Sequence, residues 1–71
     1  VNLVGPVRSI YRWQGALERA DETLMVIKAR RDRFEELSAR VQALHSYDTP
    51  EVVAVPIEAG SERYLAWLRG D

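Results

Sequence analysis

The sequence predicts a small α+β fold, in which a long β-hairpin and a third strand form a sheet with two helices on one face. Two observations indicate this class. Apolar runs with strand-like alternation or β-branched residues occur around positions 10, 25 and 55, and apolar residues at helical spacing occur between positions 34 and 44 and again near the end of the chain. The predicted order is therefore strand, strand, helix, strand, helix, within one domain over residues 1–71.

The first two strands are expected to form a long antiparallel hairpin. The stretch SIYRWQG alternates its side chains with the two-residue period of a strand, which predicts a first strand over Arg8–Leu17. The polar stretch Glu18–Glu22 has the composition of a turn, and the apolar run TLMVIKAR, residues 23–30, follows it. These segments predict a hairpin whose turn lies within Glu18–Glu22.

The next segment predicts an α-helix over Arg33–His45. Its apolar stripe consists of Phe34, Leu37, Val41 and Leu44. Asp32 is followed three residues later by Glu35, which is the spacing of a capping box at a helix N-terminus.

A third strand and a short helix complete the predicted fold. The run Val52–Ile57 is rich in β-branched residues, and its Pro56 cannot donate to a ladder, so we expect this strand at an edge of the sheet or at its end. Ser61 is a suitable N-cap for the last helix, and Gly70 suits the position after its end.

The second and third strands have apolar residues on both faces, over Leu24–Ile27 and Val52–Ile57. Two helices cover only one face of such a sheet, and a domain of this size buries a low fraction of its surface. We therefore expect another copy of the chain to cover the second face along the hairpin. Trp13 is expected to be buried by that copy more than by its own chain.

Composition excludes several classes of protein. Ten Lys and Arg nearly balance eleven Asp and Glu, for a net charge of -1, and the basic residues form no tract, which argues against a nucleic-acid or membrane-surface role. The absence of cysteine excludes disulfides and thiolate metal sites, and no apolar run has the length of a membrane span. A cytoplasmic location is the default expectation. Because the chain does not begin with methionine, we expect that upstream sequence is missing.

The stretch HSYDTPE, residues 45–51, is the sharpest candidate site. Its His45 imidazole is a good ligand for copper or zinc, and Asp48 and Glu51 would add carboxylate oxygens. The alternative is that His45 only ends a helix, where a positive charge is favoured by about 0.3 to 1 kcal/mol. The residues alone leave both interpretations open.

Aromatic and basic side chains supply weaker candidates. A cleft or interface between subunits is a possible place for the aromatic residues Tyr11, Trp13, Tyr47, Tyr64 and Trp67. Ordinary packing is the favoured role for this group. Lys28, Arg12 and Arg30 have the charge to attract an anionic ligand, but we favour solvated surface charges. There is no glycine-rich phosphate loop, and the serines have no nucleophile-elbow pattern, so we expect no enzyme.

Five stretches in order resemble the divalent-cation tolerance proteins of the CutA family. They are VNLV, SIYRWQG, LMVIKAR, HSYDTPEVVAVPIEAG and YLAWLRG. The resemblance runs through essentially all 71 residues. It implies a ferredoxin-like domain that assembles into a homotrimer through its long hairpins, similar in architecture to the PII-type signal proteins. It also implies a link to copper and other divalent cations.

The sequence departs from this family in two respects. Family members usually begin with a further strand and helix, and a cysteine implicated in copper binding commonly stands just before the position of Val1. Residues 1–71 would then be the C-terminal two-thirds of a CutA-type domain. The absent strand is central, between those that contain Met25 and Val55, so the third strand is expected either to pair directly with the second or to leave a slot. Ser46 stands where the family commonly has proline.

Two functions from different classes follow. The first is a trimeric protein of divalent-cation tolerance that binds ions, or senses a small ligand in a PII-like manner, at intersubunit clefts near His45 and Tyr47. The second is a non-catalytic scaffold or protein-interaction module without specific metal binding.

Overall fold

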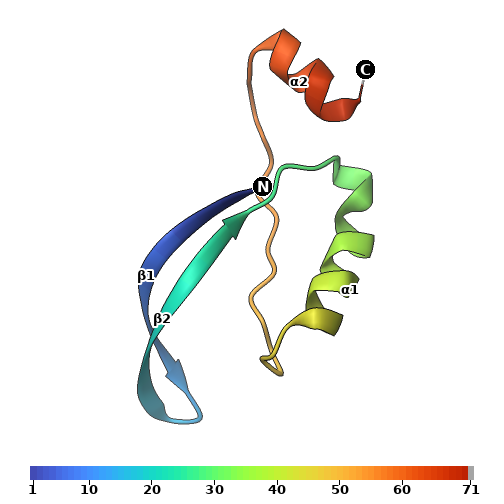
Figure 1. Ribbon diagram of the computed structural model, residues 1–71. Coiled ribbons are helices and arrows are strands. Elements are labelled where there is room, and N and C mark those ends of the chain that lie inside the picture. The colour runs from blue at the N-terminus through green and yellow to red at the C-terminus, as the bar shows by residue number, and fades with distance from the viewer. Residues whose placement is uncertain (71) are drawn as a thin grey trace.

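The computed structural model describes residues 1–70, which form a two-stranded antiparallel sheet, one 3-10 turn and two α-helices. β1 spans Asn2–Trp13 and β2 spans Ala16–Val26; α1 spans Phe34–Leu44, after the 3-10 turn Arg31–Arg33, and α2 spans Glu62–Arg69. Figure 1 shows α1 beside the hairpin and α2 beyond the end of the hairpin at which the chain begins. The α+β class is confirmed, and the order is consistent with part of a ferredoxin-like domain.

The hairpin turns at Gln14 and Gly15, so the predicted turn at Glu18–Glu22 is wrong. Both turn residues have positive φ, 50° and 81°, which is the geometry of the two-residue turn that matches the twist of the flanking strands. Glycine adopts such a φ without steric cost. The polar stretch is part of β2 instead, because a strand that faces solvent on one side carries polar residues as readily as a turn does.

The hairpin is a long ribbon with one irregularity. Its ladder runs from Trp13 opposite Ala16 to Asn2 opposite Val26, and the register shifts between Val4 and Val7. Pro6 lies inside this shift and has no N–H to donate to the ladder. A two-stranded ribbon is marginally stable in water at best, so it needs further packing partners.

α1 agrees with the predicted helix to within one residue at each end. His45 is its C-cap, and the His45 N–H donates to the carbonyl oxygen of Val41 at 2.9 Å. The predicted capping box is absent, because Asp32 lies inside the 3-10 turn and caps no helix. Its carboxylate accepts two hydrogen bonds from the Arg30 guanidinium instead, at 2.9 and 3.1 Å.

Both predicted caps of the last helix are confirmed. The Ser61 hydroxyl oxygen accepts a hydrogen bond from the N–H of Tyr64 at 3.4 Å, at the N-terminus of α2. Gly70 ends the helix in the left-handed conformation, with φ 84°, and its N–H donates to the Trp67 carbonyl oxygen at 3.0 Å. Within residues 1–70, no helix has the length and apolar character that crossing a membrane requires.

The predicted third strand over Val52–Ile57 does not form. Within the described residues this segment is irregular and makes no backbone hydrogen bond with β2. Of the two alternatives for this strand, the structure shows the unpaired one. A strand forms only where a neighbouring ladder satisfies its backbone, and Pro56 removes one donor as well. Val53 and Val55 are 72% and 82% exposed as a result.

No residue between 1 and 70 is fully buried. The apolar residues that face inward on the two helices are only half-buried, namely Phe34, Leu37, Val41, Leu65 and Leu68. The radius of gyration is 15.1 Å, whereas a compact domain of this length would have about 11 Å. The chain therefore presents elements that are arranged around a core it does not itself complete.

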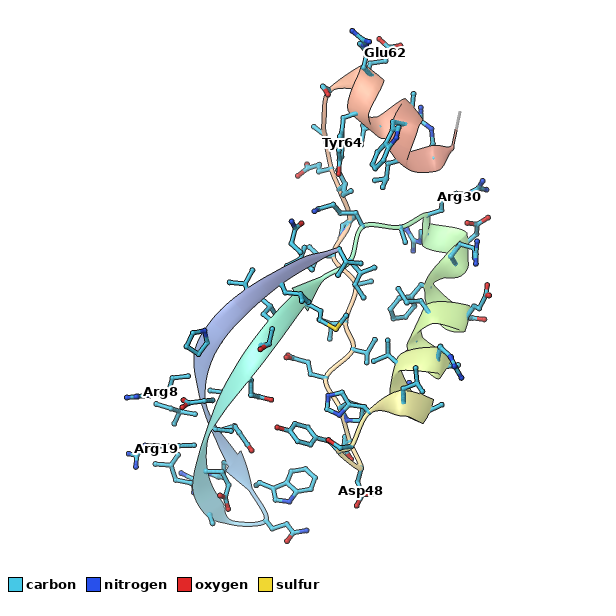
Figure 2. All side chains as sticks on the ribbon, in the orientation of Figure 1. Arg8, Arg19, Arg30, Asp48, Glu62 and Tyr64 are labelled. Carbon is cyan, nitrogen blue, oxygen red and sulfur yellow. The ribbon has the colours of Figure 1, made fainter. Side chains whose placement is uncertain are left out.

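The two faces of the hairpin differ in how far they are covered. On the inner face, Val7, Ser9, Ala20 and Glu22 are half-buried. On the outer face the apolar side chains are 52 to 68% exposed, and they are Leu3, Ile10, Leu17 and Met25. Figure 2 shows the outer-face residues Arg8 and Arg19 pointing away from α1. Trp13 belongs to the inner face and is 48% exposed.

We predict that the 71-residue chain alone unfolds without a sharp thermal transition or aggregates, because it leaves an unpaired β2 edge beside exposed apolar side chains. A longer chain with a strand and a helix before Val1 should melt cooperatively as an oligomer. Circular dichroism and light scattering of both chains would check this. A sharp melt of the short chain as a stable trimer would show that it needs no added segment.

Candidate functional site

His45 and Tyr47 lie against each other in the loop that follows α1. Their ring centroids are 4.6 Å apart, with the planes inclined at 55°. The backbone N–H of Tyr47 donates a hydrogen bond to Nδ1 of His45 at 3.0 Å. Since the His45 N–H caps α1, the same residue ends the helix and holds the first turn of the loop.

This contact assigns the tautomer of the imidazole. Because Nδ1 accepts a hydrogen bond, its lone pair is occupied, and the proton of the neutral ring is on Nε2. A cation on Nε2 would require the proton to move to Nδ1, where it would oppose the N–H of Tyr47. Binding of a metal ion through Nε2 of His45 would therefore require the hydrogen bond from the Tyr47 N–H to be broken.

The side chain of Tyr47 lies near Glu22 of the hairpin. The pKa of the Tyr47 phenol is raised, first by the negative charge of the Glu22 carboxylate and second by hydrogen bonding to that carboxylate, with smaller contributions from desolvation and from Tyr11. Glu22 comes from β2 and Tyr11 from β1. Both lie on the inner face, because Tyr11 is opposite Glu18 and side chains two residues apart share one face of a strand.

The residues described here do not by themselves fit a metal centre. Among residues 1–70, no three His, Asp or Glu side chains form a group that could hold a metal ion. His45 is engaged by the loop, and Figure 2 shows Asp48 at the outer tip of the turn that follows. The roles of His45, Asp48 and Glu51 as metal ligands stay predictions, and they require ligands from outside this chain.

Four of the five aromatic candidates fall into two separate groups within the chain. Tyr11 and Tyr47 belong to the group around Glu22, whereas Tyr64 and Trp67 form a pair on α2 with ring centroids 5.9 Å apart. Figure 2 shows Tyr64 at the opposite end of the molecule from Asp48. Trp67 is 72% exposed. The role of these residues at an interface between subunits stays a prediction.

Sequence reasoning missed Glu22, because it placed that residue in a turn. The signal that would have found it is the pair Gln14-Gly15. A two-residue turn there fixes the register of the hairpin, and the register places Glu22 on the same face as Tyr11.

We predict that Glu22→Gln lowers the pKa of Tyr47 toward the ordinary tyrosine value, because the substitution removes the negative charge that favours the protonated phenol. A pH titration of the Tyr47 ring by NMR would measure it. Asp21→Asn is the matched control, since Asp21 lies one residue away on the outer face and pairs with Arg8 at 3.9 Å. An equal shift in both variants would refute a specific contact.

The sign of the pH dependence follows from the same contact. The folded chain holds the Tyr47 proton more tightly than the unfolded chain does. The contact therefore stabilises the fold below the ordinary pKa of tyrosine, and this contribution disappears as the pH rises through the raised pKa.

Comparison with known proteins gives relatives with similar sequences over nearly the whole chain. The divalent-cation tolerance protein CutA of Thermus thermophilus is 48% identical over 69 residues, which are 97% of this chain and 67% of that protein. Protein CutA, chloroplastic, of Arabidopsis thaliana is 45% identical over 69 residues, and there the chain spans 38% of the relative's length.

Solved structures agree with the fold as well. The divalent cation tolerance protein from Thermus thermophilus matches with a TM-score of 0.93 and 46% identity, over 97% of this chain and 67% of that one. The periplasmic divalent cation tolerance protein CutA from Archaeoglobus fulgidus matches with a TM-score of 0.90 and 40% identity, over 94% of this chain and 65% of that one. The family model of the CutA1 divalent ion tolerance protein matches residues 1–71. The chain therefore belongs to the CutA family of divalent-cation tolerance proteins.

Proposed function

We propose that the chain acts in divalent-cation tolerance as one subunit of a homotrimer, and that it binds divalent cations such as copper, or a small ligand, near His45 and Tyr47. One observation carries this proposal. The exposed His45 imidazole lies against the Tyr47 ring, and Tyr47 lies close enough to Glu22 on the inner face of the hairpin for that carboxylate to raise its pKa. This position of His45 and Tyr47 supports a ligand site at the border of an incomplete surface.

Exposed apolar surface supports the assembly. The outer face of the hairpin carries Leu3, Ile10, Leu17 and Met25 in solvent. On this face they alternate with the charged residues Arg8, Arg19 and Asp21. Exposed apolar side chains gathered on one face favour an interaction surface, and in a symmetric oligomer the same face of every subunit is covered. A homotrimer is the state that the family resemblance implies, and its clefts would bring a neighbouring chain to the His45 loop.

Ligands from a neighbouring chain would complete a cation site. His45, Asp48 and Glu51 supply at most one imidazole and two carboxylates, a donor set with little selectivity among divalent cations. Ligand groups from a neighbouring chain would raise the affinity for the cation. The hydrogen bond from the Tyr47 N–H to Nδ1 of His45 would break when the cation binds. The affinity for the ion then depends on assembly.

A catalytic role is not part of the proposal. The relatives are named as tolerance proteins, and we propose that the chain binds without transforming its ligand. The cytoplasmic location expected from composition also stays a prediction. Among the relatives, one is named chloroplastic and one is titled periplasmic.

The second candidate is a scaffold without specific metal binding, and a separate observation favours it. Within residues 1–70 no three-ligand group exists, and His45 already has the role of a helix cap and loop anchor. In that case the exposed apolar faces would serve protein interaction alone.

We predict that His45→Ala weakens copper binding by at least about tenfold. It should shift the thermal melt little, since the helix is capped by the His45 backbone N–H, which alanine keeps. Calorimetric titration of the assembled protein with copper would measure the affinity. Glu35→Gln, an exposed carboxylate at the start of α1, serves as the control for general charge effects. Unchanged affinity in His45→Ala would favour the scaffold.

A further inference from the structure

We infer that the outer face of the hairpin, near its turn, is a docking surface for the inner face of the hairpin of a second copy of this chain. Opposite charge on the two faces is the observation that carries the inference. It rests on the proposed homotrimer and deepens that proposal, because it assigns which surfaces of neighbouring subunits meet and through which side chains.

The arginines of the hairpin all lie on its outer face. Arg8 is directly opposite Asp21, and Arg12 points to the same face because residues an even number of positions apart on a strand share a face. Arg19 of β2 is two residues from Asp21 and joins this group. Figure 2 shows Arg8 and Arg19 on the side away from α1. The strands β1 and β2 contain no other basic residue.

The inner face carries the opposite charge. Glu18 lies opposite Tyr11 on this face, and Glu22 lies opposite Val7. Within β1 and β2, these two acids are the charged residues of the inner face. Three arginines and one aspartate give the outer face a formal charge of +2, and two glutamates give the inner face -2. The two faces of one ribbon are therefore complementary in charge.

Most of this charge has no partner within residues 1–70. Arg8 pairs with Asp21 at 3.9 Å, and both side chains remain largely exposed. The side chains of Arg12, Arg19 and Glu18 make no hydrogen bond or ion pair with another described residue, and all three are exposed. They are therefore available to charges on another chain at no cost in existing contacts.

Apolar side chains lie among these charges on both faces. On the outer face Ile10 and Leu17 are 58 and 59% exposed, and on the inner face Tyr11 and Trp13 are 42 and 48% exposed. Burial of apolar surface supplies most of the affinity of an interface, whereas complementary charges fix its register and its partner. Near the turn, each face offers both kinds of group.

The charge pattern favours contact between unlike faces. Contact of outer face with outer face, as in a two-fold dimer, would bring the arginines of two copies together, and like charges in contact oppose association. Contact of outer face with inner face brings Arg12 and Arg19 of one copy to Glu18 of the partner subunit. Each copy then keeps one free face of each kind, and repetition of the same contact closes a ring where the rotation allows it. A homotrimer requires an interface of this type.

A charge-reversal series tests the inference, with sedimentation over a dilution series as the measurement. It uses the form of the chain, short or extended, that assembles in solution. Arg19→Glu and Glu18→Arg should each raise the dissociation constant of the assembly at least about tenfold, because each brings like charges into contact. The double variant should recover most of the lost affinity, since it reverses the charge of both faces. The matched control is Arg63→Glu, an exposed arginine on α2, which should leave assembly unchanged.

Recovery in the double variant has one explanation. Glu18 and Arg19 are neighbours on β2 and lie on opposite faces, so they do not contact each other within one chain. Recovery therefore comes from contact between chains.

Two outcomes would overturn the inference while the homotrimer stands. The first is assembly that neither single variant weakens more than Arg63→Glu does. The second is weakening in both single variants without recovery in the double variant, because unlike faces would then not meet. An unsubstituted chain that stays monomeric in both its short and its extended form would refute the proposed homotrimer, and the inference with it.

Discussion

The exposed apolar side chains of this chain have to be buried by other polypeptide, and the other features of the structure depend on that constraint. Burying an exposed leucine or isoleucine side chain is worth about 1.5 to 3 kcal/mol. Leu3 and Val53 are 68% and 72% exposed, and no residue between 1 and 70 is fully buried. The hydrogen bonds of the ribbon do not replace this energy, because unfolded backbone groups bond to water instead. A stable fold therefore requires other polypeptide on the hairpin and beside the irregular segment Val52–Ile57.

The same constraint explains why the described residues do not form a complete ligand site. Within the chain, the Tyr47 N–H bonds to the His45 imidazole, Tyr47 lies near Glu22 of the inner face, and His45 caps α1. These contacts orient the loop but gather no set of three ligands among the described residues. If neighbouring chains complete the core in the proposed assembly, they would be placed to complete the ligand site also. Such a site would report assembly and ligand concentration together.

Sequence patterns predicted those elements whose signals are local. The apolar stripe located α1, and Ser61 and Gly70 located both ends of α2, since caps act within one helical turn. The hairpin was predicted but its turn was misplaced, because composition favoured Glu18–Glu22 over the conformational freedom of Gly15. The strand Val52–Ile57 has the propensity for a strand and lacks the ladder, which is a non-local requirement.

Only the local part of the candidate site could be predicted from the sequence, because its other contacts join residues that are far apart along the chain. The pairing of His45 with Tyr47 follows from two residues of separation, whereas the contact with Glu22 depends on the register of a distant hairpin.

Hydrogen exchange of the hairpin amides over a dilution series tests the central claim most directly, since the claim is that surfaces outside the chain hold the fold together. The protection of β1 and β2 amides should fall as the protein is diluted, because the covered faces are lost with the assembly. Protection that is independent of concentration, in a chain shown to be monomeric, would contradict the account.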